Sequence, residues 1–163
     1  MRTVIFLVLS VFYIFVSSTD VCAQEASELE NRQVIILASS KSYQDVLAKA
    51  KDLSLKTGMV FSTREMIYDE KRGLILPDNH EDESYAGSYY LRRYNNDCGN
   101  SLSECLSIEK SDAYEGFTPG LYILVAGIHE EGSAELTAKL SQLKKTVPDA
   151  YAKKTKIFMG CMH

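Results

Sequence analysis

The chain has 163 residues, of which 45% are hydrophobic and 25% are charged, and it contains nine glycines but only three prolines. This composition is that of a globular protein, and it excludes a disordered chain, a collagen-like chain and a polytopic membrane protein. The 18 basic and 22 acidic residues give a net charge of −4. We therefore expect no nucleic-acid partner, because such partners require a basic surface.

The first 23 residues have the pattern of a secretory signal peptide. Arg2 supplies a positive charge, and the apolar run over 4–16 is shorter than the ~20 residues that span a bilayer. The small-residue rule predicts cleavage after Ala23. An alternative interpretation makes Cys22 a lipoprotein anchor, although Asp20 stands where such a signal has a small residue. We expect a periplasmic or secreted protein with no transmembrane segment after signal cleavage.

Cleavage leaves residues 24–163, a length that folds as a single domain. Export places this chain in an oxidising compartment, where cysteine pairs are expected. Cys98 and Cys105 lie in a Gly/Asn/Ser-rich segment that can turn back on itself, and closing this loop contributes roughly 2.5 kcal/mol. We predict a Cys98–Cys105 disulfide, which leaves Cys161 free or paired with a second molecule.

The first structured unit is predicted over 34–64. A short apolar run at 34–39 is typical of a strand, and a second strand is predicted at 59–64. Between them a helical period begins after Ser42, a good N-cap, and ends at Gly58. The apolar face of this predicted helix consists of Tyr43, Val46, Leu47, Ala50 and Leu53.

A similar unit is predicted over 120–159, with strands at 122–128 and 155–159 and a helix capped by Ser133. Its helical stripe is Leu136, Leu140, Leu143 and Val147. Chance resemblance between two amphipathic units is an alternative to duplication. The order β-α-β, middle segment, β-α-β predicts an α+β fold of the ferredoxin-like βαββαβ type, with a four-stranded antiparallel sheet and two helices on one face.

Both predicted strands 34–39 and 122–128 are apolar on both sides, so we expect them to be central strands with both faces covered. The insertion over 65–119 is the candidate cover for the face opposite the helices. It opens with a hairpin whose turn is 69–73, and its tyrosine-rich part includes a predicted edge strand at 88–94.

The second unit also carries a family pattern. It reads YILVAG at 122–127 and DAYAK at 149–153, and the helical positions between them are Ala134, Ala138, Leu140 and Leu143. Over residues 121–159 the chain thus resembles the sporulation-related repeat (SPOR) family. The resemblance implies a βαββαβ fold and periplasmic binding of peptidoglycan glycan strands across the sheet face. Ile128 and His129 depart from the family, which has a Ser-Phe pair there.

The best candidate ligand-binding residues are Tyr90, Arg92 and Tyr94. In a strand they share one side, where an arginine that can bind a carboxylate lies between two tyrosines that can stack on sugar rings. The alternative is structural: the tyrosines cap the core and the arginines pair with the acidic run 78–83.

The sequence gives little support for a metal site, a cofactor site or a catalytic motif. The acidic run 78–83 does not have the spacing of an EF-hand, and Cys161 with His163 offers only two zinc ligands. We expect no metal and no cofactor, and no familiar enzyme motif is present.

We therefore predict an exported, non-catalytic binding protein of the cell envelope, whose partner is a cell-wall glycan such as peptidoglycan or an envelope protein. The alternative is a small periplasmic inhibitor or interaction module that presents the 98–105 loop to an enzyme. A third hypothesis is a small hydrolase that uses Cys161 and a histidine.

Overall fold

A computed structural model describes residues 29–90 and 105–158. The predicted signal peptide, its cleavage site and the lipidation alternative at Cys22 lie outside these residues. So do Arg92, Tyr94, Cys98 and Cys161. In the part of the chain that is described, no helix has the length and apolar character needed to cross a membrane.

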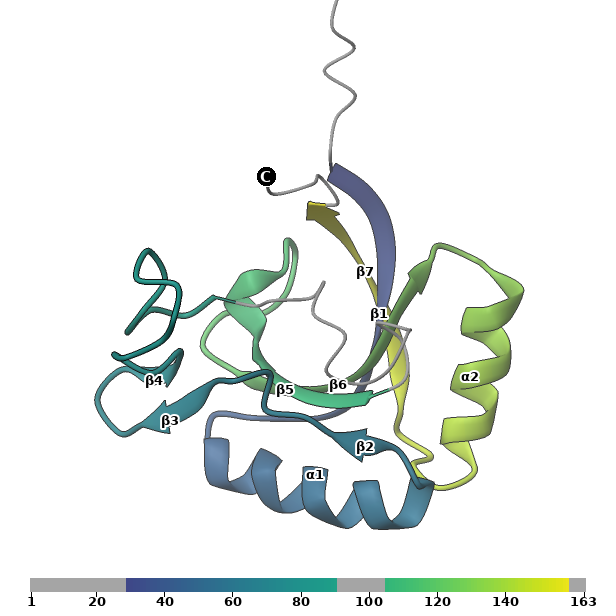
Figure 1. The fold of residues 1–163 in the computed structure, drawn as a ribbon. Coiled ribbons are helices and arrows are strands. Elements are labelled where there is room, and N and C mark those ends of the chain that lie inside the picture. The colour runs from purple at the N-terminus through teal and green to yellow at the C-terminus, as the bar shows by residue number, and fades with distance from the viewer. Residues whose placement is uncertain (1–28, 91–104, 159–163) are drawn as a thin grey trace, which may run out of the picture.

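Five strands form one mixed sheet in the order β2-β5-β6-β1-β7 (Figure 1). At its centre, β1 (Leu29–Ser40) and β6 (Tyr122–Glu130) pair antiparallel. On the other side of β1 lies β7 (Tyr151–Phe158), and on the other side of β6 lies β5 (Cys105–Lys110), both antiparallel to their neighbours. The short strand β2 (Val60–Phe61) runs parallel to β5 at the edge.

The expectation of two adjacent central strands is confirmed, because β1 and β6 pair from Arg32–Glu130 to Ser40–Tyr122 and each has a second neighbour. The α+β class is also confirmed. The expected four-stranded antiparallel sheet is wrong, since the sheet has five strands and the β2–β5 pair is parallel. The ferredoxin-like strand arrangement is not confirmed.

The two helices begin where the sequence places them. α1 spans Tyr43–Thr57 and α2 spans Ala134–Lys144. The hydroxyl oxygens of Ser42 and Ser133 each accept a hydrogen bond from the backbone N–H three residues later, at 3.3 and 3.1 Å. Gly58 ends α1 in the left-handed conformation, with a φ of 73°.

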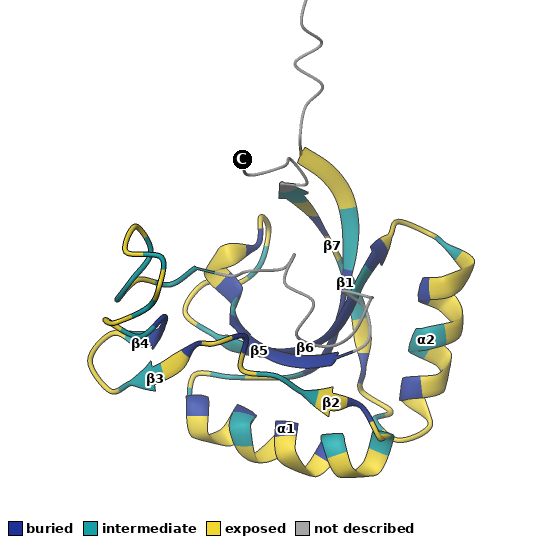
Figure 2. Cartoon of the chain, viewed as in Figure 1, coloured by how far each residue is buried: buried dark blue, intermediate teal, exposed yellow. Residues whose placement is uncertain are grey.

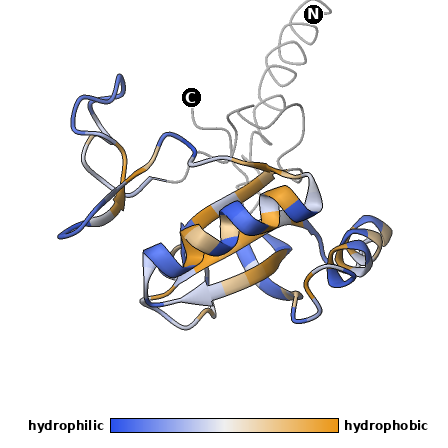
Figure 3. Cartoon of the chain, turned by 90° about the horizontal axis from the view of Figure 1, so that it is seen from below, coloured by the Kyte–Doolittle hydropathy of each residue, from blue (hydrophilic) through white to orange (hydrophobic). Residues whose placement is uncertain are grey.

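Both helices pack on the same face of the sheet, as expected. Seen from below, α1 lies across the sheet and α2 lies beside it (Figure 3). The buried residues are concentrated on the inner sides of the helices and along β5 and β6 (Figure 2). The main cluster joins helical and strand residues, among them Val46, Leu53, Leu136, Leu143, Ile35, Leu124 and Leu106.

The opposite face is covered mainly by residues 111–121, which begin with a short 3-10 helix, Ser111–Ala113. Tyr114 and Phe117 pack there against the second apolar cluster, whose strand residues are Val34, Ile36, Ile123 and Val125. The expectation that the tyrosine-rich insertion covers this face is only partly right. Four of its tyrosines pack instead against the helix-side cluster: Tyr68, Tyr85, Tyr89 and Tyr90.

The insertion begins with the predicted hairpin, formed by β3 (Ile67–Asp69) and β4 (Gly73–Ile75). The ring of Tyr68 stacks on that of Tyr43 in α1, with centroids 4.3 Å apart, so the hairpin is joined to the helix side. The expected edge strand at 88–94 is wrong over its described part, because residues 88–90 form no strand.

Candidate functional site

Of the three predicted ligand-binding residues, only Tyr90 lies in the described part of the chain. Its ring stacks on Tyr85 with centroids 3.8 Å apart, and both rings pack against the helix-side core. This arrangement favours the structural alternative for Tyr90. Arg92 and Tyr94 lie outside the described residues, so the proposed tyrosine–arginine site stays a prediction. The Cys98–Cys105 disulfide stays one for the same reason.

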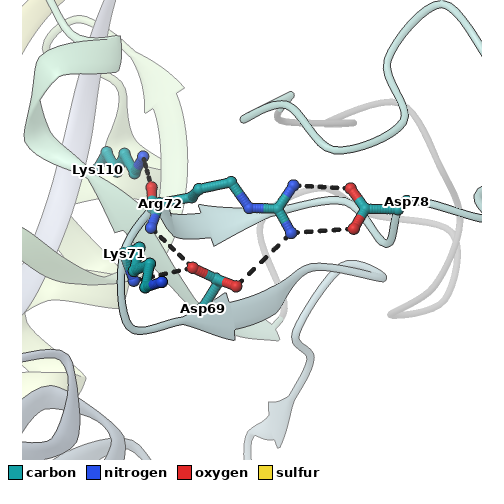
Figure 4. Close-up of polar contacts among 5 residues, drawn as sticks. All are labelled: Asp69, Lys71, Arg72, Asp78 and Lys110. Atoms are coloured by element: carbon teal, nitrogen blue, oxygen red, sulfur yellow. Dashed lines mark hydrogen bonds and ion pairs between the residues drawn. The ribbon is translucent and has the colours of Figure 1, made fainter.

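An exposed network of charges braces the hairpin (Figure 4). The guanidinium of Arg72 donates two hydrogen bonds to the carboxylate of Asp78, at 2.7 and 3.0 Å. The carboxylate of Asp69 accepts hydrogen bonds from the backbone N–H groups of Arg72 and Lys71, and these bonds hold the pKa of Asp69 below the usual range. The Lys110 ammonium reaches the backbone carbonyl of Arg72 at 3.3 Å. These contacts fix the turn and the chain at Asp78 to the sheet, which is a structural role.

A second polar group joins the β2–β3 loop to the acidic run. The Nδ1 atom of His80 accepts a hydrogen bond from the backbone N–H of Asp82, at 3.0 Å. The ring proton therefore lies on Nε2, and this atom is 3.2 Å from Oε2 of Glu65. Arg64 and Glu65 both have left-handed backbone conformations, with φ of 51° and 64°. This strained pair turns Arg64 toward Cys105 Sγ, at 3.4 Å, and Glu65 toward His80.

A buried carboxylate lies on the face opposite the helices. Glu109 in β5 is fully buried, and the hydroxyl groups of Ser107, at 2.6 Å, and of Tyr114 donate to its two oxygens. The hydroxyl oxygen of Ser111 accepts a hydrogen bond from the backbone N–H of Leu121, at 3.0 Å. These bonds fix residues 111–121 over the sheet. The sequence analysis missed this cluster, although the S-x-E-x-S alternation at 107–111 shows polar residues on one side of a strand.

The C-terminal ends of α1 and α2 approach one another (Figure 1). A cavity of about 590 Å³ is lined there by Lys56, Lys139 and Lys145, and none of the described residues that line it is acidic. Its apolar part is formed by Met59, Val60 and Leu143, of which Val60 is exposed. We call this cavity the lysine compartment.

The α2 wall of this compartment is one helical stripe. Lys139, Gln142 and Leu143 follow a spacing of three and four residues, so they lie on one side of α2, and Thr146 follows in the turn after the helix. Leu143 is buried in the helix-side core, and Lys139 and Gln142 line the cavity. Lys139 and Lys145 form no ion pair with any residue of the described ranges.

A second cavity of about 470 Å³ adjoins the first and shares Lys56 and Thr146 with it. Its wall on α1 is again a helical stripe, consisting of Lys49, Asp52, Leu53 and Lys56. The turn before β7 supplies Asp149, and β7 itself supplies the half-exposed ring of Tyr151. We call this second cavity the aspartate compartment, and the two together the interhelical groove.

His129 lies beneath α2, beside the groove. Its side chain is buried, with Nδ1 3.6 Å from the carboxylate of Glu135 and with no hydrogen-bond partner for Nε2 among the described residues. Burial lowers the pKa of His129; Glu135 opposes this shift and Lys139 adds to it. The neutral ring therefore packs under the helix that carries Lys139.

Comparison of the chain with protein-family models, with curated proteins and with solved structures finds no match. The resemblance to the SPOR family accordingly stays an expectation from the sequence. The site must be interpreted from its own geometry. Among the described residues no group of three or more His, Cys, Asp or Glu side chains is placed to hold a metal ion.

Proposed function

We propose that this chain is an exported, non-catalytic binding protein of the cell envelope that binds peptidoglycan in the interhelical groove. The observation that carries the proposal is the lysine compartment. Three lysines surround a cavity of about 590 Å³ in a chain whose net charge is −4. A cavity of this size falls in the range of roughly 300–1,000 Å³ that is usual for ligand sites.

Peptidoglycan is a polymer that carries free carboxylates at every repeat. Lys139 and Lys145 offer positive charge without a described acidic partner. The exposed Val60 supplies apolar surface in the same lining. Each exposed lysine contributes at most about 1 kcal/mol to such a contact. A repeating polymer makes many such contacts at once, so weak single sites are sufficient for retention on the wall.

The groove is a better ligand site than the sheet face that the SPOR resemblance implies. Tyr114 and Phe117 cover the centre of that face, where they pack against β1 and β6. The helix side, in contrast, has an open cavity with uncompensated charge. We therefore place the ligand between the helices and keep the surface of Tyr90, Arg92 and Tyr94 as the competing site.

Sedimentation of the chain over residues 24–163 with purified sacculi tests the proposal. We expect retention at low salt, and a roughly tenfold weaker apparent affinity for the Lys139→Glu/Lys145→Glu variant, which corresponds to about 1.4 kcal/mol. The matched control is Lys51→Glu/Lys144→Glu, which changes the net charge equally at exposed positions outside the groove lining. We expect less than a twofold effect from this control.

Three results contradict the proposal. Equal weakening by both double variants means that retention depends on net charge and not on the groove. A wild-type chain that is not retained favours the alternative of a periplasmic inhibitor or interaction module. A Tyr90→Ala/Arg92→Ala variant, measured in parallel, loses retention only if the competing site is the correct one. Circular dichroism of each variant verifies that the helices are intact.

A further inference from the structure

We infer that the groove recognises the stem peptides of the polymer, and not its sugar backbone, through a carboxylate in the lysine compartment and an ammonium group in the aspartate compartment. The inference rests on the proposed function. It assigns the groove a zwitterionic peptide ligand, such as a stem whose diamino acid residue has a free side-chain amine.

The charges of the two compartments differ. The lysine compartment contains only basic residues among its charged lining, whereas the aspartate compartment has two aspartates, Asp52 and Asp149, beside Lys49 and Lys56. Asp52 is paired with Lys56 at 2.8 Å, and this pair stands between the compartments. Asp149 forms no ion pair within the described ranges, so its carboxylate is the one that is available to a cation.

Tyr151 strengthens the case for a cation next to Asp149. Its ring is 45% exposed and lines the same compartment two residues along the chain. An ammonium group over the face of a tyrosine ring is attracted by the negative charge density of that face. Sugar recognition is less well served, because Tyr151 is the one aromatic side chain in the described lining of the whole groove.

The aspartate compartment is held in place by the backbone. The N–H of Val147 donates to the carbonyl of Leu143 at 2.8 Å, and the N–H of Ala150 donates to the carbonyl of Val147 at 3.0 Å. β7 begins immediately afterwards, where Tyr151 lies opposite Ile36 of β1. Asp149 therefore has a fixed position between the end of α2 and the sheet, as a recognition site requires.

The shared residues make the two compartments one site. Lys56 and Thr146 line both cavities, so a single short peptide can extend from one to the other. The order of charges along the groove then sets the direction of the peptide, with its carboxylate toward Lys139 and Lys145 and its amine toward Asp149.

Calorimetric titration with synthetic stem tetrapeptides tests this inference. The probes are a peptide with a free side-chain amine, the same peptide acetylated at that amine, and glycan strands from which an amidase has removed the stems. We expect the free-amine peptide to bind, acetylation to weaken binding at least fivefold, and stripped strands not to bind. Asp149→Asn should reduce the effect of acetylation to less than twofold, while the exposed control Glu70→Gln should leave it unchanged.

The outcomes separate this inference from the proposed function. If stripped strands are bound as tightly as intact sacculi and the peptide is not bound, the stem-peptide inference is overturned and wall binding stands. If the peptide is bound but acetylation has no effect in the wild-type chain, the ammonium subsite is wrong. If neither sacculi nor peptides are bound, both proposals fail.

Discussion

The hairpin and the sheet approach one another closely at Gly73, and substituting this residue tests the packing of the hairpin. Gly73 has a φ of +78°, and a β-carbon there would lie 2.8 Å from the hydroxyl oxygen of Tyr122. The ring of Tyr122 makes edge contacts with Tyr43 and Tyr68, at centroid distances of 5.6 and 6.1 Å. Gly73→Ala must therefore displace a ring that holds α1, the hairpin and β6 together.

The expected loss has two parts. A left-handed alanine costs about 1–2 kcal/mol. Disturbing two edge contacts costs about 0.5–1.5 kcal/mol for each contact. We expect Gly73→Ala to lower the free energy of unfolding by about 2–5 kcal/mol in total. Gly116 is the matched control, because its φ is +79° and no atom lies within 4 Å of its added β-carbon. Gly116→Ala should cost only the backbone part.

A double-mutant cycle with Tyr122→Phe isolates the contact. Without the hydroxyl, the nearest atoms to an alanine β-carbon at position 73 are the flexible end of Lys110, at 3.4 Å. In this background Gly73→Ala should cost no more than Gly116→Ala. Urea unfolding followed by circular dichroism measures all four free energies. Equal costs of Gly73→Ala and Gly116→Ala in the wild-type background, or a cost that Tyr122→Phe does not reduce, would refute the close approach.

Three further predictions concern the caps, the buried histidine and the buried carboxylate. Ser42→Ala removes the N-cap of α1 and should lower the free energy of unfolding by about 1 kcal/mol, while Ser141→Ala on the exposed side of α2 should not. The pKa of His129 is lower in the folded chain than its ordinary value of 6.5, so the unfolded chain binds the proton more readily. The free energy of unfolding should therefore fall as the pH drops below 6.5 toward the folded-state pKa. His129→Gln should flatten this part of a pH profile measured by urea unfolding. A slope that does not change in this variant means that another group is responsible. Tyr114→Phe removes a hydroxyl that donates to Glu109 and should cost about 1–3 kcal/mol by urea unfolding, whereas Tyr151→Phe at a half-exposed ring should cost less than about 0.5 kcal/mol.

The parts of the fold that local patterns specify could be predicted from the sequence. Ser42, Ser133 and Gly58 act within a single helical turn, and the hairpin depends on a turn of a few residues, so each could be located without knowledge of its neighbours. The pairing of β2 with β5 could not, because β2 has only two residues and its partner lies more than forty residues away. Whether two such distant strands pair depends on how the rest of the sheet is assembled.

The candidate site could not be predicted from the sequence for a related reason. Its walls come from the first and the second β-α-β units, and a lysine such as Lys139 on a helix is normally interpreted as part of a solvated face. The ligand site was predicted at the tyrosines of the insertion because these residues are clustered in the sequence. Tyr90 in fact packs on Tyr85 at the helix-side core, where aromatic burial is sufficient to explain it.

The strand order explains why a groove exists at all. β6 and β7 are parallel to one another with only β1 between them, so α2 connects strands that are two positions apart. β1 and β2 are also parallel, but β6 and β5 both lie between them, so α1 connects strands that are three positions apart. The two units that look alike in sequence are therefore not equivalent in the sheet. Because the helices cross different numbers of strands on the same face, they do not pack along their lengths, and their C-terminal ends leave the interhelical groove between them.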